Sequence, residues 1–138
     1  MSLAGRDLER LCDDYALDFK RPSVFPRNGL RASWIACVAS DEGWCAQLTR
    51  AVFVANFVED REISDVGVLT EILTDLGRDA PTVIEAADAP ANKARLRAQT
   101  EEAKRHGIFG APSFTVDDEL FWGNDRLGTA IAWSLGLR

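Results

Sequence analysis

The chain has 138 residues, 46% of them hydrophobic and 28% charged, a composition that suits one compact domain with its own apolar core. Its formal net charge of −6 at pH 7 excludes the clustered positive charge that nucleic acids and anionic membranes select, so we expect neither as a partner. The three cysteines form no CxxC pair, and no apolar run resembles a signal sequence or a membrane span. These features predict a reduced, cytoplasmic protein.

Helices dominate the predicted structure up to residue 107. Leu8, Leu11 and Cys12 recur at helical spacing near the start. Two prolines within residues 19–26 cannot continue a helix, because proline lacks the N–H that the helix requires. This segment is therefore predicted to be an extended loop that follows a first helix.

Three further helices are predicted to begin at the capping residues Asn28, Ser40 and Ser64, and two more at the prolines of a first helical turn, Pro81 and Pro90. The capped helices carry apolar stripes that we expect to face the core, namely Leu30, Trp34, Ile35 and Val38, then Trp44, Leu48, Val52 and Ala55, and finally Val68, Leu69, Ile72, Leu73 and Leu76. Helix and short loop thus account for the whole of this part.

The pattern changes after residue 107. Residues 113–116 and 120–122 are β-branched and aromatic runs on either side of three acidic residues, which predicts a β-hairpin. Asn124 or Asp125 is predicted to cap a last helix. The apolar residues of that helix are expected to face inward, namely Leu127, Ala130, Ile131 and Leu135.

A lone two-stranded hairpin is marginal in water, and its open edges offer unpaired backbone groups to a neighbour. The predicted helices and hairpin fit the α/β class. They are the elements that remain of a thioredoxin-like fold when its first β-α-β unit is missing. We therefore predict a mostly helical insert domain over residues 1–107 and the C-terminal ββα part of a thioredoxin-like domain over residues 108–138. A second copy, or a companion chain, is expected to complete the sheet.

A Gly-x-x-Gly-x-Pro turn, GIFGAPS at residues 107–113, leads directly into the first predicted strand. A proline at this place, after a small residue, predicts a cis peptide bond before Pro112, which would turn the N–H and C=O of Ala111 toward an extended, peptide-like ligand. Downstream, the helix start at Asn124 and Asp125 offers backbone N–H groups to a carboxylate and a side-chain carboxylate to an ammonium group. Together these features suit the zwitterionic head and cysteinyl part of glutathione.

GIFGAPS and ELFWGNDRL, the latter at residues 119–127, resemble the C-terminal signature of the 2-hydroxychromene-2-carboxylate isomerase and kappa-class glutathione transferase family. Residues 25–32 and 61–65 are similar to the helical insert of that family. The resemblance implies a glutathione-dependent isomerase or transferase, with glutathione as cofactor and a small aromatic or electrophilic substrate. It assigns the main chain of Ala111 to the cysteinyl part of glutathione, the cis-proline to Pro112, and the γ-glutamyl contacts to Asn124 and Asp125.

The family's first strand and its serine or cysteine nucleophile have no counterpart here, so we name no catalytic residue and expect weak or no catalysis from this chain alone. His106 is interpreted as a helix-end residue, the cysteines as small hydrophobes, and Trp122 as core or wall. The acidic residues 117–119 suit a solvated turn, and no metal site is predicted. Two alternatives remain open, a thiol-disulfide oxidoreductase of the same superfamily and a non-catalytic binding or interaction module.

Overall fold

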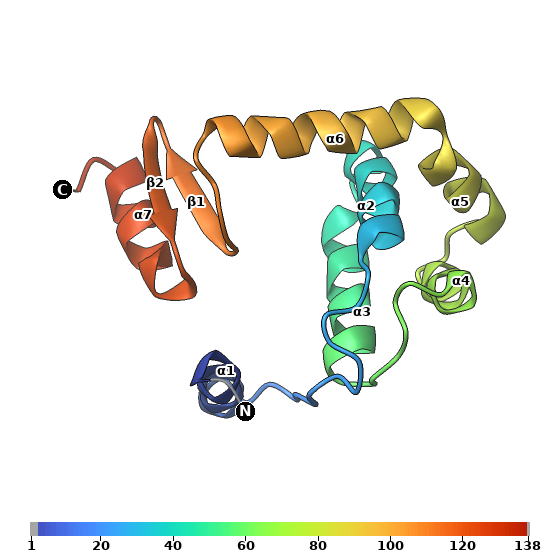
Figure 1. Ribbon diagram of the computed structural model, residues 1–138, viewed down its shortest axis with the longest axis horizontal. Helices are drawn as coiled ribbons and strands as arrows, with labels where there is room; N and C mark the ends of the chain where they lie inside the picture. The colour runs from blue at the N-terminus through green and yellow to red at the C-terminus, as the bar shows by residue number, and fades with distance from the viewer. Residues whose placement is uncertain (1–2, 138) are drawn as a thin grey trace. The chain divides into compact units, whose positions relative to one another are not determined.

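The computed structural model describes residues 3–137, which divide into two compact units, one within residues 1–93 and the other within residues 94–138. The helices of the first unit are α1 (Leu3–Asp14), α2 (Leu30–Glu42), α3 (Cys45–Phe57), α4 (Val66–Asp75) and α5 (Ala80–Asp88), and α6 (Pro90–Arg105) continues from it into the second (Figure 1). The predicted domain boundary at residue 107 follows the end of α6, whereas the boundary between the two compact units, after residue 93, lies inside that helix. The predicted domain assignment stays a prediction. None of the helices within residues 3–137 is both long and apolar enough to span a bilayer.

The core of the first unit is formed by four helices. α2 contacts α3 and α5, and α4 contacts the same two helices. The fully buried large side chains are those of Ile35, Leu48, Leu69 and Leu73, each worth about 1.5–3 kcal/mol in the transfer from water. The predicted apolar stripes on these helices are confirmed, except that Leu30 is 48% exposed.

The predicted start of a helix at Ser40 is wrong, because α2 runs through this residue. Gly43 ends α2 with φ of 81°, and its N–H donates to the Ala39 carbonyl. α3 then begins at Cys45. A serine fits a cap and also fits an exposed helical position, so the left-handed glycine three residues later decides where the helix stops.

The helix predicted from Ser64 begins one residue later. Asp65 is the N-cap of α4, and its carboxylate accepts the N–H of Gly67 at 2.6 Å. The Ser64 hydroxyl instead donates to the Glu62 carboxylate. Asn28 does bind the start of α2, since its side-chain oxygen accepts the N–H of Leu30 at 2.9 Å; Gly29 holds the N-cap position itself.

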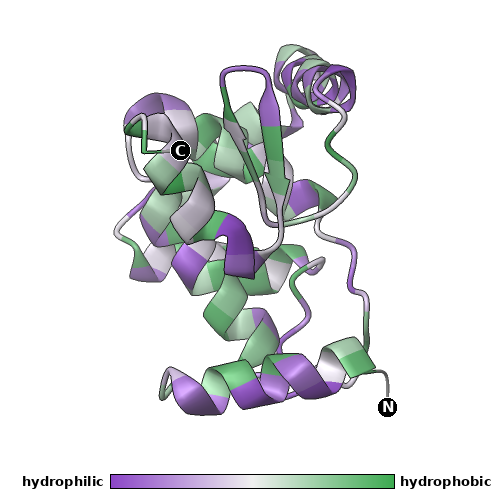
Figure 2. Ribbon diagram, turned by 90° about the vertical axis from the view of Figure 1, so that its left-hand side faces the viewer, coloured by the Kyte–Doolittle hydropathy of each residue, from purple (hydrophilic) through white to green (hydrophobic). Residues whose placement is uncertain are grey.

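α1 is an amphipathic helix with no buried residue. In Figure 2 hydrophilic and hydrophobic residues alternate along it, next to the label of the N-terminus. Leu8 and Cys12 line a groove of about 360 Å³ together with residues of α3, Phe53 and Phe57 among them. This apolar groove lies entirely within the first unit.

The second unit contains the hairpin and the last helix. Its elements are the strands β1 (Ser113–Val116) and β2 (Glu119–Trp122), the 3₁₀ turn η1 (Asn124–Arg126) and the helix α7 (Leu127–Ser134). The strands pair antiparallel, with Ser113 opposite Trp122 and Val116 opposite Glu119, and they form a two-stranded sheet among the described residues. α7 contacts both strands, and its Trp133 ring meets Phe121 edge-on at 5.9 Å between ring centroids. The chain is thus mostly helical with one small antiparallel sheet, as the sequence predicted.

The predicted inner face of α7 is largely wrong. Ala130 is buried, but Ile131 and Leu135 are 51% and 68% exposed and Leu127 is 42% exposed. Helical periodicity shows which residues share a face, and it does not show what covers that face. Here α7 directs Trp133 at the sheet, and two short strands provide too little surface to bury the whole stripe.

Candidate functional site

The two sequence motifs adjoin at one end of the hairpin. The N–H of Gly123 donates to the carbonyl of Pro112 at 3.0 Å. Because these residues flank the paired residues Ser113 and Trp122, this bond continues the strand ladder by one step. It brings together all four residues predicted to bind the ligand, Ala111, Pro112, Asn124 and Asp125, each of which is exposed.

The main chain at Ala111 is accessible and unpaired. The peptide bond between Ala111 and Pro112 is cis. The N–H and C=O of Ala111 have no hydrogen-bond partner among residues 3–137, whereas the Ser113 hydroxyl donates to the Gly110 carbonyl at 2.5 Å and fixes the turn. One donor and one acceptor are therefore available to an extended ligand.

The capping role predicted for Asn124 and Asp125 is wrong, because both residues lie inside η1, after its N-cap Gly123. Gly123 has φ of 111° and ψ of 148°, a conformation that bends the chain before the 3₁₀ turn begins. In the described chain the N–H groups of Asn124 and Asp125 donate to no acceptor. A Cβ placed on Gly123 would lie 2.6 Å from the Oδ1 atom of Asp125, so the carboxylate lies directly against the bend.

These groups form a small, polar, open site. Two backbone N–H groups, of Asn124 and Asp125, have no acceptor among residues 3–137, and the Asp125 carboxylate lies against Gly123. The bond between Gly123 and Pro112 joins this segment to the residue that follows Ala111. Backbone N–H groups suit a carboxylate and an aspartate suits an ammonium group. The donor set therefore fits a zwitterionic amino-acid head followed by a peptide backbone.

An exposed aromatic pair borders the same turn. The rings of Phe109 and Trp122 lie 5.2 Å apart between centroids, and the two residues are 72% and 54% exposed. The indole lies on Gly110 so closely that a Cβ there would be 2.6 Å from Nε1. Of the two places predicted for Trp122, core or wall, the core is therefore wrong, and the strand alternation that separates Trp122 from Phe121 was the signal for this.

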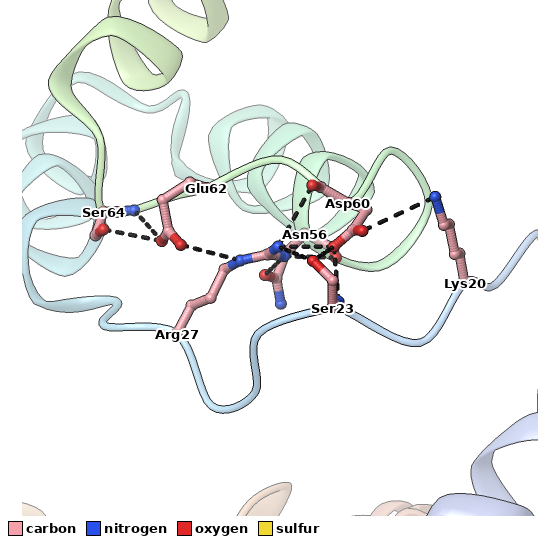
Figure 3. A network of polar contacts seen from close by, with 7 residues as sticks. All are labelled: Lys20, Ser23, Arg27, Asn56, Asp60, Glu62 and Ser64. Atoms are coloured by element: carbon pink, nitrogen blue, oxygen red, sulfur yellow. Dashed lines mark hydrogen bonds and ion pairs between the residues drawn. The ribbon is translucent and has the colours of Figure 1, made fainter.

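A second polar cluster, unanticipated from the sequence, lies in the first unit around Arg27 (Figure 3). The Arg27 side chain is 3% exposed, and its guanidinium binds Asp60 Oδ1 at 2.7 Å and Glu62 Oε2 at 3.3 Å. It also donates to the Asn56 side-chain oxygen at 3.0 Å. Asn56 is itself buried, with 6% of its surface exposed, and this contact satisfies its side-chain oxygen.

This Arg27 cluster ties the loop before α2 to the loop between α3 and α4. The backbone N–H of Ser23 donates to Asp60 at 2.8 Å. That bond and the Arg27 guanidinium lower the pKa of Asp60 to about 2, and the hydroxyl and N–H of Ser64 lower the pKa of Glu62. Asn56 and Glu62 lie more than 25 positions from Arg27 in the sequence, so no local pattern predicts these contacts. The two carboxylates of the cluster face two cations, Arg27 and Lys20, whose Nζ atom lies 3.9 Å from Asp60. Its role is structural.

Comparison with known proteins covers both units. Residues 3–130 match the family model described as a DSBA-like thioredoxin domain. The chain is 31% identical over 123 residues to a 2-hydroxychromene-2-carboxylate isomerase of Sphingobium xenophagum, covering 88% of this chain and 61% of that protein. It is 29% identical over 134 residues to a protein of the same name from Pseudomonas putida, covering 90% and 66%.

A solved structure of 2-hydroxychromene-2-carboxylate isomerase is also similar, with a TM-score of 0.83 and 25% sequence identity. The match covers 96% of this chain and 64% of the solved chain. The chain therefore spans less than two thirds of the length of each of these proteins.

Proposed function

The chain belongs to the DSBA-like thioredoxin domain family. On this premise we propose that it binds glutathione and functions as a glutathione-dependent isomerase or a related glutathione transferase. The similar proteins named 2-hydroxychromene-2-carboxylate isomerase favour the isomerase. Their name describes a bicyclic, aromatic carboxylate. A small aromatic acid is accordingly the second substrate that we propose.

One observation carries this proposal, the hydrogen bond between Gly123 and Pro112 that joins the two motifs. It holds the unpaired N–H and C=O of Ala111 beside the unpaired N–H groups of Asn124 and Asp125. We assign the main chain of Ala111 to the cysteinyl part of glutathione. The amide of Asn124, the carboxylate of Asp125 and the backbone N–H groups are assigned to its γ-glutamyl end.

Bound glutathione would supply a thiolate, the nucleophilic form of a thiol. The four proposed contact residues contain no thiol or hydroxyl side chain, and we assign to them the binding and orientation of the ligand. Two hydrogen bonds to one residue, Ala111, would fix both the direction and the register of an extended ligand along the turn. A charge-matched end at Asp125 would exclude ligands that lack an ammonium group.

A calorimetric titration with glutathione tests the proposal. We expect binding to the wild-type chain and at least about tenfold weaker binding to Asp125→Asn, because a hydrogen bond to a charged group contributes about 1.5–3 kcal/mol. Asp118→Asn is the matched control, since it removes an exposed carboxylate of the same unit at the hairpin turn. Its affinity should equal that of the wild type. Absence of binding, or equal losses in both variants, would exclude the proposed site.

A further inference from the structure

Phe109 and Trp122 are large apolar side chains that the second unit leaves exposed, by 72% and 54%. We propose that this aromatic pair holds the aromatic ring of the second substrate and thereby sets its specificity. The inference rests on the proposed function, because it assigns the ring-binding part of the same site. It adds two residues to which the motif resemblance gave no role toward a ligand.

The aromatic pair is held in place before any ligand arrives. The indole of Trp122 rests against the backbone of Gly110, where no side chain would fit, and the Phe109 ring contacts it at 5.2 Å with an interplanar angle of 48°. A ring fixed in this way loses little conformational freedom when a ligand stacks on it. Two tilted rings also offer a planar ligand both an offset face and an edge, the arrangements that aromatic rings prefer.

The strand register explains why Trp122 is free for this role. Phe121 and Trp122 are successive residues of β2, so their side chains point to opposite faces of the sheet. Phe121 contacts Trp133 of α7, so α7 covers the face on which Phe121 lies. Trp122 lies on the other face and remains more than half exposed.

The position beside Ala111 links the aromatic pair to the reaction. Gly110 lies against the indole and is followed directly by Ala111, whose unpaired main chain we assign to the cysteinyl part of glutathione. A ring stacked on the aromatic pair would thus lie next to the cysteinyl part of bound glutathione, which carries the thiol. Proximity of a nucleophile and its substrate is the main contribution that a binding site of this kind can make.

The test uses 2-naphthoate, a bicyclic aromatic carboxylate, and its saturated analogue decahydro-2-naphthoate, titrated into the full chain with and without glutathione. We expect Trp122→Leu and Phe109→Leu each to weaken 2-naphthoate binding about tenfold, and Trp122→Phe, which keeps a ring, to restore most of it. Glutathione affinity should not change in these variants. Tyr15→Leu, which removes a 65% exposed ring of the first unit, is the control and should bind 2-naphthoate like the wild type.

Each of the following outcomes would overturn the inference. Equal affinity of wild type and Trp122→Leu for 2-naphthoate, or equal affinity of the wild type for the aromatic and saturated acids, would show that the rings do not recognise the ligand. A change of oligomeric state in Trp122→Leu by light scattering, without a change in 2-naphthoate affinity, would assign the aromatic pair to a second copy. A wild-type chain that binds glutathione but not 2-naphthoate refutes this inference alone, whereas one that binds no glutathione refutes the proposed function as well.

Discussion

Substitution of Gly123 by alanine should damage both the second unit and its ligand site. Gly123 has φ of 111° and ψ of 148°, a region that is essentially restricted to glycine. The added Cβ would also lie 2.6 Å from the Oδ1 atom of Asp125. The exposed carboxylate can rotate away from this clash, so the steric conflict is resolved by moving the group that we assign to the ammonium of glutathione.

The expected loss in the free energy of unfolding follows from the backbone conformation of Gly123. Holding an alanine in such a conformation costs about 1–3 kcal/mol. Gly128→Ala is the matched control, because Gly128 lies in α7 with no atom within 4 Å of the added Cβ, and glycine to alanine inside a helix gains about 0.5–1 kcal/mol. The two variants of the second unit should therefore differ by about 1.5–4 kcal/mol in free energy of unfolding.

Hydrogen exchange at the amides of β1 and β2 measures the opening of the second unit separately from the first. We expect faster exchange and at least about tenfold weaker glutathione binding for Gly123→Ala, and wild-type binding for Gly128→Ala. Equal protection and equal affinity in the two variants would refute the argument. Faster exchange with unchanged glutathione affinity would support the backbone strain at position 123 but would contradict the assignment of Asp125 to the glutathione site.

Three other predictions concern the first unit. Because the folded-state pKa of Asp60 is about 2, below its usual 3.8, its contribution to stability is complete above pH 4 and is lost as the pH falls toward 2; Asp60→Asn should flatten the acid limb of unfolding followed by circular dichroism. Leu73→Ala, at a fully buried position, should cost about 2.7–5 kcal/mol in urea unfolding, against almost nothing for Leu137→Ala, whose side chain is 67% exposed. Asp65→Ala should lower the free energy of unfolding by about 1 kcal/mol, and Ser64→Ala by clearly less, in the same urea unfolding experiment. A larger loss for Ser64→Ala would show that Ser64 is the cap.

Local sequence patterns identified the elements well, since each depends on neighbouring residues. The stripe on α4 and the glycine-rich turn before β1 are read directly from spacing. The thioredoxin-like family predicted from the two motifs is confirmed by the match of residues 3–130 to a DSBA-like thioredoxin domain. Helix starts were less predictable. Asp65 is the N-cap of α4 where Ser64 was predicted, and Ser40 lies inside α2, so that Trp44 and not Ser40 precedes α3.

Burial and distant pairing were beyond local reasoning. The contacts of Arg27 with Asn56 and Asp60 join residues 29 and 33 positions apart, and scattered charges give no sign of such a cluster. Ile131 and Trp133 share a short helix, yet one is 51% exposed and the other contacts Phe121. The surface available to cover them is a property of the small sheet and not of the helix.

The spacing between the two motifs is itself a physical feature of the site. The register pairs Ser113 with Trp122 across a turn in which Asp117 has φ of 53°, a conformation that aspartate tolerates better than most residues. One residue added to that turn would shift the pairing and send the side chains of the shifted strand to opposite faces. The bond from Gly123 to Pro112 would be lost and Trp122 would leave Gly110. Hairpin length, more than any one side chain, therefore keeps the polar contacts and the aromatic pair in one site.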